Sequence, residues 1–226
     1  MKAMIFAAGM GTRLKPFTDS HPKALAQVNG VPLLERNIKY LQGYGINDFV
    51  INIHHFGGQI LAFLAENDNF GANIEISNES EKLLETGGGL LFAKRFLENE
   101  KTFLIMNVDI LTDLNISNFI RLHETKGAMI TLAVSDRDSS RKLLFNDNMY
   151  LKGWKNLKDN KKKVVGGIFK LRELAFSGVH CVNSEIFDKM TRTGKFSIMD
   201  EYMDLMKEDI IIGYQQIGRA SCRERV

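Results

Sequence analysis

Short apolar segments of strand type alternate with helical segments along the first 135 residues, and this alternation restricts the fold more than any other feature. The strand-type segments are residues 2–6, 49–53, 73–77, 102–106 and 129–134, and the helical ones are residues 32–44, 58–66, 89–97 and 116–124. Such alternation is typical of parallel strands joined by helices. We therefore expect an α/β fold with a mostly parallel central sheet.

The pattern becomes less regular after about residue 135. Strands are predicted at residues 176–182 and 210–214, helices at 184–190 and 197–207, a hairpin at 143–150 with Asp147 and Asn148 in its turn, and a charged loop at 159–163. Neither a repeat nor a linker interrupts the sequence. The simplest organisation is one domain over residues 1–216, with 1–135 and 136–216 as its two halves.

The composition is that of an ordinary soluble globular protein, with 44% hydrophobic and 25% charged residues. The sequence lacks an apolar run long enough to span a membrane and the features of a signal peptide, so we expect a cytoplasmic protein. The two cysteines, Cys181 and Cys222, indicate neither a disulfide framework nor a zinc site.

The last ten residues, 217–226, are interpreted as a tail that is not native. They follow a predicted strand abruptly, have no periodicity and resemble vector-derived sequence. They contain three arginines and one glutamate, which leaves about +1 of the net charge of +3 for the rest of the chain. A charge this small does not predict nucleic-acid binding.

A glycine-rich segment follows the first predicted strand directly. It runs Ala7-Ala8-Gly9-Met10-Gly11-Thr12-Arg13-Leu14, and Lys23 follows ten residues after the arginine. Glycines allow close backbone approach to a ligand, consecutive amides can hold an anion, and the guanidinium suits phosphate oxygens. A phosphate clamp is one interpretation; the alternatives are a tight turn after the strand and an exposed lysine. The dinucleotide pattern GxGxxG and the P-loop pattern are both absent.

Three further places carry candidate site residues. Asn107 and Asp109 follow the strand predicted at 102–106, where a carboxylate can hold Mg²⁺ or cap a turn. Asp113 is predicted to cap the helix that begins near residue 116. The segment Glu85-Thr86-Gly87-Gly88-Gly89 precedes a helix and offers free amides or a flexible cap. His54 and His55 are interpreted as structural or pocket-rim residues.

The segment AAGMGTRLKPFT…HPKAL resembles the signature of the sugar-nucleotide pyrophosphorylases, which are nucleotidyltransferases acting on sugar 1-phosphates. The resemblance extends to about residue 216 and is greatest to the small enzymes that activate N-acetylmuramic acid 1-phosphate with UTP and to similar mannose-1-phosphate guanylyltransferases. It implies a Rossmann-like three-layer sandwich of the nucleotide-diphospho-sugar transferase type.

The resemblance also implies the roles of individual residues. Arg13, Lys23 and Asp109 would be catalytic, with Asp109 binding Mg²⁺, and Asn107, Ser177 and Gly178 would bind the sugar. The nucleoside triphosphate would be held by Ala7, Ala8, Gly9, Gly11, Thr12, Arg13, Lys23, Glu85, Thr86, Gly87 and Gly88. The family's second metal aspartate, in a Trp-x-Asp-Val-Gly motif, has no counterpart in this sequence.

The sequence is also compatible with three other functions. The substrates could be mannose or glucose 1-phosphate with another triphosphate, or the chain could bind nucleotide without turnover. A dinucleotide-binding oxidoreductase is a more distant alternative. We expect neither a nucleic acid nor a membrane as a partner, and a monomer or a small homo-oligomer.

Overall fold

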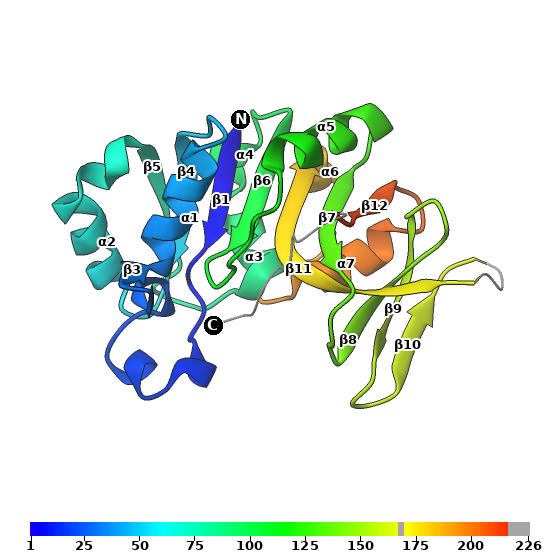
Figure 1. The fold of residues 1–226 in the computed structure, drawn as a ribbon, viewed down its shortest axis with the longest axis horizontal. Helices are drawn as coiled ribbons and strands as arrows, with labels where there is room; N and C mark the ends of the chain where they lie inside the picture. Colours follow the sequence, from blue (N-terminus) through cyan, green and yellow to red (C-terminus); the bar gives the residue numbers. More distant parts are fainter. Residues whose placement is uncertain (167–169, 217–226) are drawn as a thin grey trace.

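The computed structural model describes residues 1–166 and 170–216, so the predicted tail at 217–226 lies outside the described residues. One ten-stranded sheet forms the centre of the molecule (Figure 1). Its strands are β1 (Lys2–Phe6), β4 (Asp48–Ile53), β5 (Asn73–Asn78), β6 (Thr102–Asn107), β7 (Ile130–Ser135), β8 (Arg141–Phe145), β9 (Leu151–Asn156), β10 (Lys161–Val164), β11 (Arg172–Asn183) and β12 (Ile211–Tyr214). The pair β2 (Gln27–Val28) and β3 (Val31–Pro32) forms a separate small hairpin.

The sheet has a parallel core and an antiparallel extension. Strand β1 pairs in parallel with β4 and β6, and β4 pairs in parallel with β5. Strand β11 is antiparallel to β6, β7 and β8, and the hairpin strands β8, β9 and β10 continue from there. The expected α/β fold with a mostly parallel central sheet is confirmed for this core.

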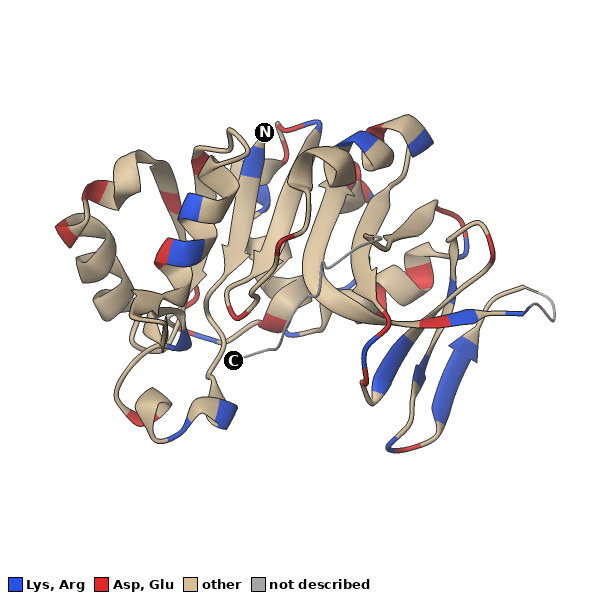
Figure 2. Ribbon diagram, in the orientation of Figure 1, with Lys and Arg blue, Asp and Glu red and all other residues tan. Residues whose placement is uncertain are grey.

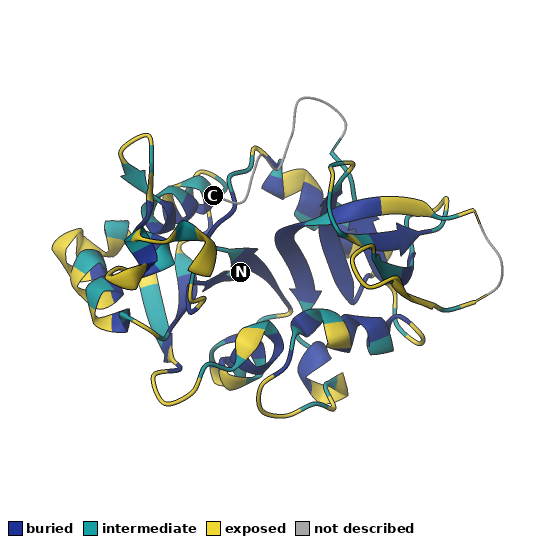
Figure 3. Cartoon of the chain, turned by 90° about the horizontal axis from the view of Figure 1, so that it is seen from below, coloured by how far each residue is buried: buried dark blue, intermediate teal, exposed yellow. Residues whose placement is uncertain are grey.

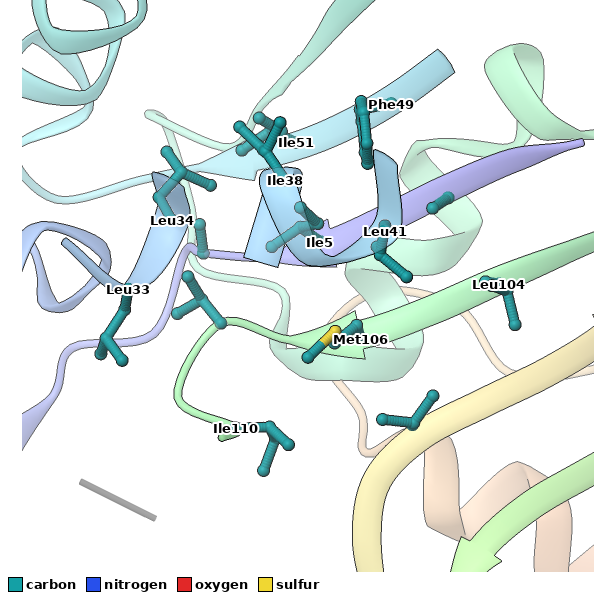
Figure 4. Packing of buried hydrophobic residues seen from close by; sticks show 14 of the residues in the cluster. Ile5, Leu33, Leu34, Ile38, Leu41, Phe49, Ile51, Leu104, Met106 and Ile110 are labelled. Carbon is teal, nitrogen blue, oxygen red and sulfur yellow. The ribbon is translucent and has the colours of Figure 1, made fainter. Parts of the chain in front are cut away.

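Helices cover both faces of the sheet, because alternate residues of each strand point to opposite sides. In β1, Ala3 and Ile5 pack with α1 (Leu33–Gln42), α2 (Gly57–Glu66) and α5 (Ile116–Lys126). Met4 and Phe6 pack on the other side with α3 (Glu85–Phe92), α4 (Lys94–Leu97), α6 (Ile186–Lys189) and α7 (Ile198–Leu205). Figure 4 shows α1 against β1, β4 and β6, and Figure 3 shows the buried strands between helices with exposed outer faces.

The hairpin predicted at 143–150 is confirmed, with Phe145 of β8 opposite Leu151 of β9 and Asp147 and Asn148 in the turn. The charged loop predicted at 159–163 is wrong, because Lys161–Val164 forms β10 along the outer edge of β9. Its four residues are exposed. An edge strand needs no buried side chain, and lysines there disfavour pairing with another chain.

Two helix starts differ from the predictions. The helix predicted at 89–97 begins at Glu85 and is interrupted at Ala93, where α3 gives way to α4. Asp113 does not cap α5: Asn115 is the N-cap, and its Oδ1 accepts a hydrogen bond from the Asn118 amide at 2.9 Å.

Among the described residues, no helix has both the length and the apolar character that crossing a bilayer requires.

Candidate active site

A cavity of about 330 Å³ opens where the parallel strands β1, β4 and β6 end. Ligands of open α/β sheets bind beyond the carboxyl ends of the strands, so this is the expected edge. The residues that line the cavity are Phe6, Ala8, Gly9, Lys23, Asn52, Glu79, Leu83, Glu85, Thr86, Asn107, Val108 and Asp109. Seven of the predicted site residues are therefore brought together: Ala8, Gly9, Lys23, Glu85, Thr86, Asn107 and Asp109.

The glycine-rich segment, residues 7–14, forms a turn that we call the phosphate turn. Gly11 has a φ of 60°, and its carbonyl accepts a hydrogen bond from the Leu14 amide at 2.8 Å. The Thr18 hydroxyl donates to the same carbonyl at 3.0 Å. A Cβ at Gly11 would lie 2.9 Å from the Cβ of Lys23. The predicted return of Lys23 to the glycine-rich turn is thus confirmed, and only glycine fits at the contact.

Residues 12–25 fold into three short 3-10 turns, η1 (Thr12–Leu14), η2 (Phe17–Asp19) and η3 (Lys23–Leu25), before the β2–β3 hairpin. Lys23 stands at the start of η3, after Pro22, which has an extended backbone. This turn directs the chain back to the sheet and places Lys23 in the cavity wall.

Lys23 and Asp109 form an ion pair inside the cavity. Both side chains are largely buried, at 11% and 10% exposure. The turn that carries Asp109 is fixed to the core: the Val108 amide donates to Phe6 O at 3.1 Å, and Asn37 Nδ2 donates to Val108 O at 2.9 Å. The pair joins η3, which contacts the phosphate turn at Gly11, to the loop after β6.

The carboxylate oxygens of Asp109 suit a magnesium ion that also binds the oxygens of a ligand. Mg²⁺ keeps several waters and is commonly bound by one or two carboxylates together with substrate phosphates. In the described part of the chain, no group of three His, Cys, Asp or Glu side chains could hold a metal ion. Asp109 can thus supply one carboxylate, and further oxygen ligands would come from water and phosphate.

Two buried polar residues that were not predicted connect the walls of the cavity. Asn52 Oδ1 accepts hydrogen bonds from the amides of Ala7 at 2.7 Å and Ala8 at 3.3 Å. Asn52 Nδ2 donates to Glu79 Oε1 at 2.7 Å, and the Leu84 amide donates to Glu79 Oε2 at 3.2 Å. The only signal in the sequence is the polar Asn52 within an otherwise apolar strand.

Burial raises the pKa of the Glu79 carboxyl above its ordinary value, and the hydrogen bonds from Asn52 and Leu84 oppose this rise. His54, whose Nδ1 hydrogen-bonds to Glu79 O at 2.7 Å, also lowers that pKa. His54 therefore supports the wall without lining the cavity, in agreement with a structural role. His55 is exposed, and its ring lies against that of Phe56 in a tilted arrangement.

The segment from Glu85 to Gly88 contributes only its first two residues to the cavity. Gly87 and Gly88 pack against the segment before α7, and their amides donate to Phe196 O at 2.9 and 3.4 Å. A Cβ at Gly87 would lie 2.3 Å from the Phe196 ring. The expectation of free amides is therefore wrong for these two glycines, because both amides donate to Phe196 O where α3 packs on the segment before α7. Glu85 adopts a φ of 61° at the start of α3.

The predicted sugar-binding residues lie in two different places. Gly178, with a φ of 82°, lies at an irregularity in β11, and a Cβ there would come within 3.1 Å of Asn107 Nδ2. Asn107 and Gly178 are therefore neighbours. Ser177 is buried beside Ser135, with the two hydroxyl oxygens 3.3 Å apart, and it faces a separate small cavity.

Arg13 does not line the cavity that contains Lys23 and Asp109. It is exposed and lines a second cavity, of about 580 Å³, together with residues of β8 and β9. Ala7, Gly11 and Thr12 also lie outside the lining of the first cavity. Ala7 and Gly11 instead support it through the contacts with Asn52 and Lys23 described above.

A profile of the nucleotidyl transferase family matches residues 2–143, which is more than half of the chain. A probable glucose-1-phosphate cytidylyltransferase of Bacillus subtilis is 27% identical, over 96% of this chain and 89% of that protein. An N-acetylmuramate alpha-1-phosphate uridylyltransferase of Neisseria meningitidis is 42% identical, over 51% of this chain and 49% of that protein. A mannose-1-phosphate guanyltransferase of Gibberella zeae is 34% identical, and the match spans 37% of its length.

Solved structures have the same fold at low sequence identity. A UDP-glucose pyrophosphorylase complexed with UDP-glucose superimposes with a TM-score of 0.78 at 17% identity, covering 98% of this chain and 92% of that chain. HddC from Yersinia pseudotuberculosis complexed with GMP-PN gives a TM-score of 0.76 at 20% identity, covering 97% and 91%. These structures show a shared fold, and the profile match shows the family. The chain therefore belongs to the nucleotidyl transferase family, as a member of its sugar-1-phosphate nucleotidyltransferases.

Proposed function

We propose that this chain transfers a uridylyl group from UTP to N-acetylmuramic acid 1-phosphate and releases pyrophosphate. The observation that carries the proposal is the buried pair of Lys23 and Asp109 between the phosphate turn and the end of β6. One cavity there holds a cation for phosphate oxygens and a carboxylate suited to Mg²⁺. The proposed setting is the cytoplasm, in the recycling of cell-wall sugars, with the chain as a monomer or small homo-oligomer.

The proposed reaction needs no nucleophilic side chain. An oxygen of the sugar 1-phosphate forms a new bond to the α-phosphorus of UTP, and the bond from that phosphorus to the β-phosphate oxygen breaks. The electron pair leaves with pyrophosphate. The work of the protein is to position two anions and to balance their charge. Lys23 would contact the α-phosphate or the incoming phosphate, and Arg13 would stabilise the pyrophosphate.

The walls of the cavity have separate proposed roles in this reaction. Ala8 and Gly9 of the phosphate turn would approach the triphosphate, and Glu85 and Thr86 would lie beside the base and ribose. Asn107 and Gly178 would contact the sugar. Asp109 would hold Mg²⁺, which would offset negative charge on the phosphate oxygens when bound.

The choice of substrates rests on sequence similarity. Two N-acetylmuramate alpha-1-phosphate uridylyltransferases match the chain at 42% and 37% identity, over about half of its length. A relative matched over almost the whole chain is the probable cytidylyltransferase for glucose 1-phosphate, at 27% identity. The second candidate is therefore a reaction of glucose or mannose 1-phosphate with another triphosphate.

The test is pyrophosphate release over a grid of UTP, CTP, GTP and dTTP against N-acetylmuramic acid, glucose and mannose 1-phosphates. The proposal predicts the highest kcat/KM for UTP with N-acetylmuramic acid 1-phosphate. A higher value for any other pair would assign the second candidate. Saturable binding of UTP in the presence of Mg²⁺, with no pyrophosphate from any pair, would instead indicate a nucleotide-binding form without turnover.

A further inference from the structure

The second cavity, between the phosphate turn and the β8–β9 hairpin, has an unusual charge. Five of the residues that line it are cationic, and none is acidic: Arg13, Arg137, Arg141, Lys142 and Lys158. Figure 2 shows lysine and arginine gathered on β8, β9 and β10. Its volume of about 580 Å³ is sufficient for a sugar.

The five cations of this cavity have no carboxylate partner within residues 1–166 and 170–216. Arg137 donates to Phe176 O at 3.0 Å, and Lys142 Nζ donates to Arg137 O at 2.6 Å, so both side chains are held at the wall by backbone carbonyls. Three hairpin lysines outside the cavity are paired: Lys155 with Glu173, Lys161 with Asp159 and Lys163 with Asp204. The cavity thus brings five cations without a carboxylate partner onto one concave surface.

Several unpaired cations on one concave surface repel one another and attract anions. Arginine suits carboxylate and phosphate oxygens because its planar donors match their geometry. Two aromatic side chains, Trp154 and Phe176, also line this cavity, and both are half-buried. Aromatic faces beside cations favour a ligand with both an apolar face and negative charge, which is the character of an anionic sugar and not of a free inorganic ion.

We propose that this cavity, lined by Arg137, Arg141, Lys142, Lys158 and Trp154, binds a second anionic group on the sugar substrate, beyond its 1-phosphate. The inference rests on the proposed function and adds the residues that would recognise a further carboxylate or phosphate on the sugar 1-phosphate. Arg13 lines the cavity, so the cavity adjoins the phosphate turn, which we propose holds the triphosphate.

The experiment compares sugar phosphates that differ in one anionic group. N-acetylmuramic acid 1-phosphate differs from N-acetylglucosamine 1-phosphate by its 3-O-lactyl group, which carries a carboxylate. Glucuronic acid 1-phosphate and glucose 1,6-bisphosphate differ from glucose 1-phosphate by a carboxylate and by a phosphate. We expect kcat/KM to be at least about tenfold higher for an acidic member than for its neutral counterpart. Which anion gives the preference distinguishes a carboxylate ligand from a phosphate ligand.

The variant R141Q/K158Q removes two exposed cations of the cavity that have no side-chain partner. We expect it to reduce the preference for the acidic sugar to about threefold or less, mainly through KM. The matched control, K161Q/K162Q, removes two lysines of the neighbouring strand β10 and should keep the preference. Raising the salt concentration should reduce the preference in the parent protein.

The inference fails if the parent protein uses the neutral and acidic sugars equally well, or if both double variants keep the same preference. In those cases pyrophosphate is still released, and the proposed function stands. If no sugar phosphate yields pyrophosphate, the proposed function fails instead. The inference is then decided by calorimetric binding of the same sugar pairs: tighter binding of the acidic member that is lost in R141Q/K158Q supports it, and equal binding overturns it.

Discussion

Two glycines of the phosphate turn, separated by one residue, have different physical reasons to be glycine. Gly11 has a left-handed backbone, and a Cβ there would lie 2.8 Å from Thr18 Cγ2. It is therefore required by the fold of the turn itself. At Gly9 a Cβ would meet no atom within 4 Å. Gly9 also lines the cavity, so its missing side chain leaves space for a ligand.

Replacing each glycine by alanine separates these two reasons. Gly11→Ala should lower the free energy of unfolding by about 1–3 kcal/mol, because alanine resists positive φ and meets Thr18 and Lys23. Gly9→Ala should leave this free energy within about 0.5 kcal/mol of the parent value and weaken UTP binding by about tenfold. Urea unfolding and calorimetry measure the two effects. Parent-like UTP affinity in Gly9→Ala would show that the nucleotide does not approach this part of the turn.

At the scale of elements, the site depends on connections between strands that lie far apart in the sequence. Asn52 of β4 accepts from the phosphate turn and donates to Glu79, and Glu79 accepts from the backbone before α3. A Cβ at Gly89 in α3 would lie 2.6 Å from Glu79 Oε1, so the helix packs directly on this carboxyl. One buried amide thus connects the two loops that face the nucleotide in our proposal.

Removing that amide should loosen both loops. Asn52→Ala leaves the Ala7 and Ala8 amides without their acceptor and Glu79 Oε1 without its donor, at a cost of about 1–3 kcal/mol in the free energy of unfolding. UTP binding should weaken with it. The control is Asn73→Ala, which removes an exposed hydrogen bond to Asp48 and should change stability by less than about 0.5 kcal/mol. Equal free energies of unfolding for the two variants would mean that the hydrogen bonds of Asn52 contribute nothing to stability.

The elements with strong periodicity were predictable, and the local contacts of the site were only partly so. Strands such as β1 and β6 are continuous apolar runs, and their order defines the edge where the site lies. The 3-10 turns after Gly11 have no such pattern, because their form depends on the contact of Gly11 with Thr18 and Lys23. β10 was missed because an exposed edge strand carries no apolar alternation. The role of Asn52 needs the pairing of β1 with β4, which a single sequence does not display.

At the scale of the whole molecule, two histidines are buried in the neutral form. Burial lowers the pKa of His123 to about 4 and that of His180 to about 3. His123 hydrogen-bonds to Thr131 Oγ1 and His180 to the Tyr202 hydroxyl, both at 2.8 Å. In the unfolded chain these rings take up protons below a pH of about 6.5. The unfolded state therefore binds more protons than the folded state in mildly acidic solution.

Stability should consequently decrease as the pH falls from about 6.5 towards 4. Each buried histidine contributes a slope of up to about 1.4 kcal/mol per pH unit. The raised pKa of Glu79 acts in the opposite direction near the lower end of this range, since the folded state then takes up a proton first. The free energy of unfolding of His123→Gln should have a shallower pH dependence than that of the parent protein, measured by urea unfolding from pH 7 to 5. An unchanged slope would refute the contribution of His123.

Asp109, in the loop after β6 and paired with Lys23, is the residue on which the proposed transfer most depends. The most direct test is pyrophosphate release from the best pair of substrates by Asp109→Asn, with Asp113→Asn as the matched control in the same loop. Asparagine can still accept from Lys23, so we expect Asp109→Asn to fold and to lose turnover by about 100-fold or more. Asp113 is exposed and outside the cavity, so its variant should match the parent. Parent-like turnover in Asp109→Asn would contradict the account.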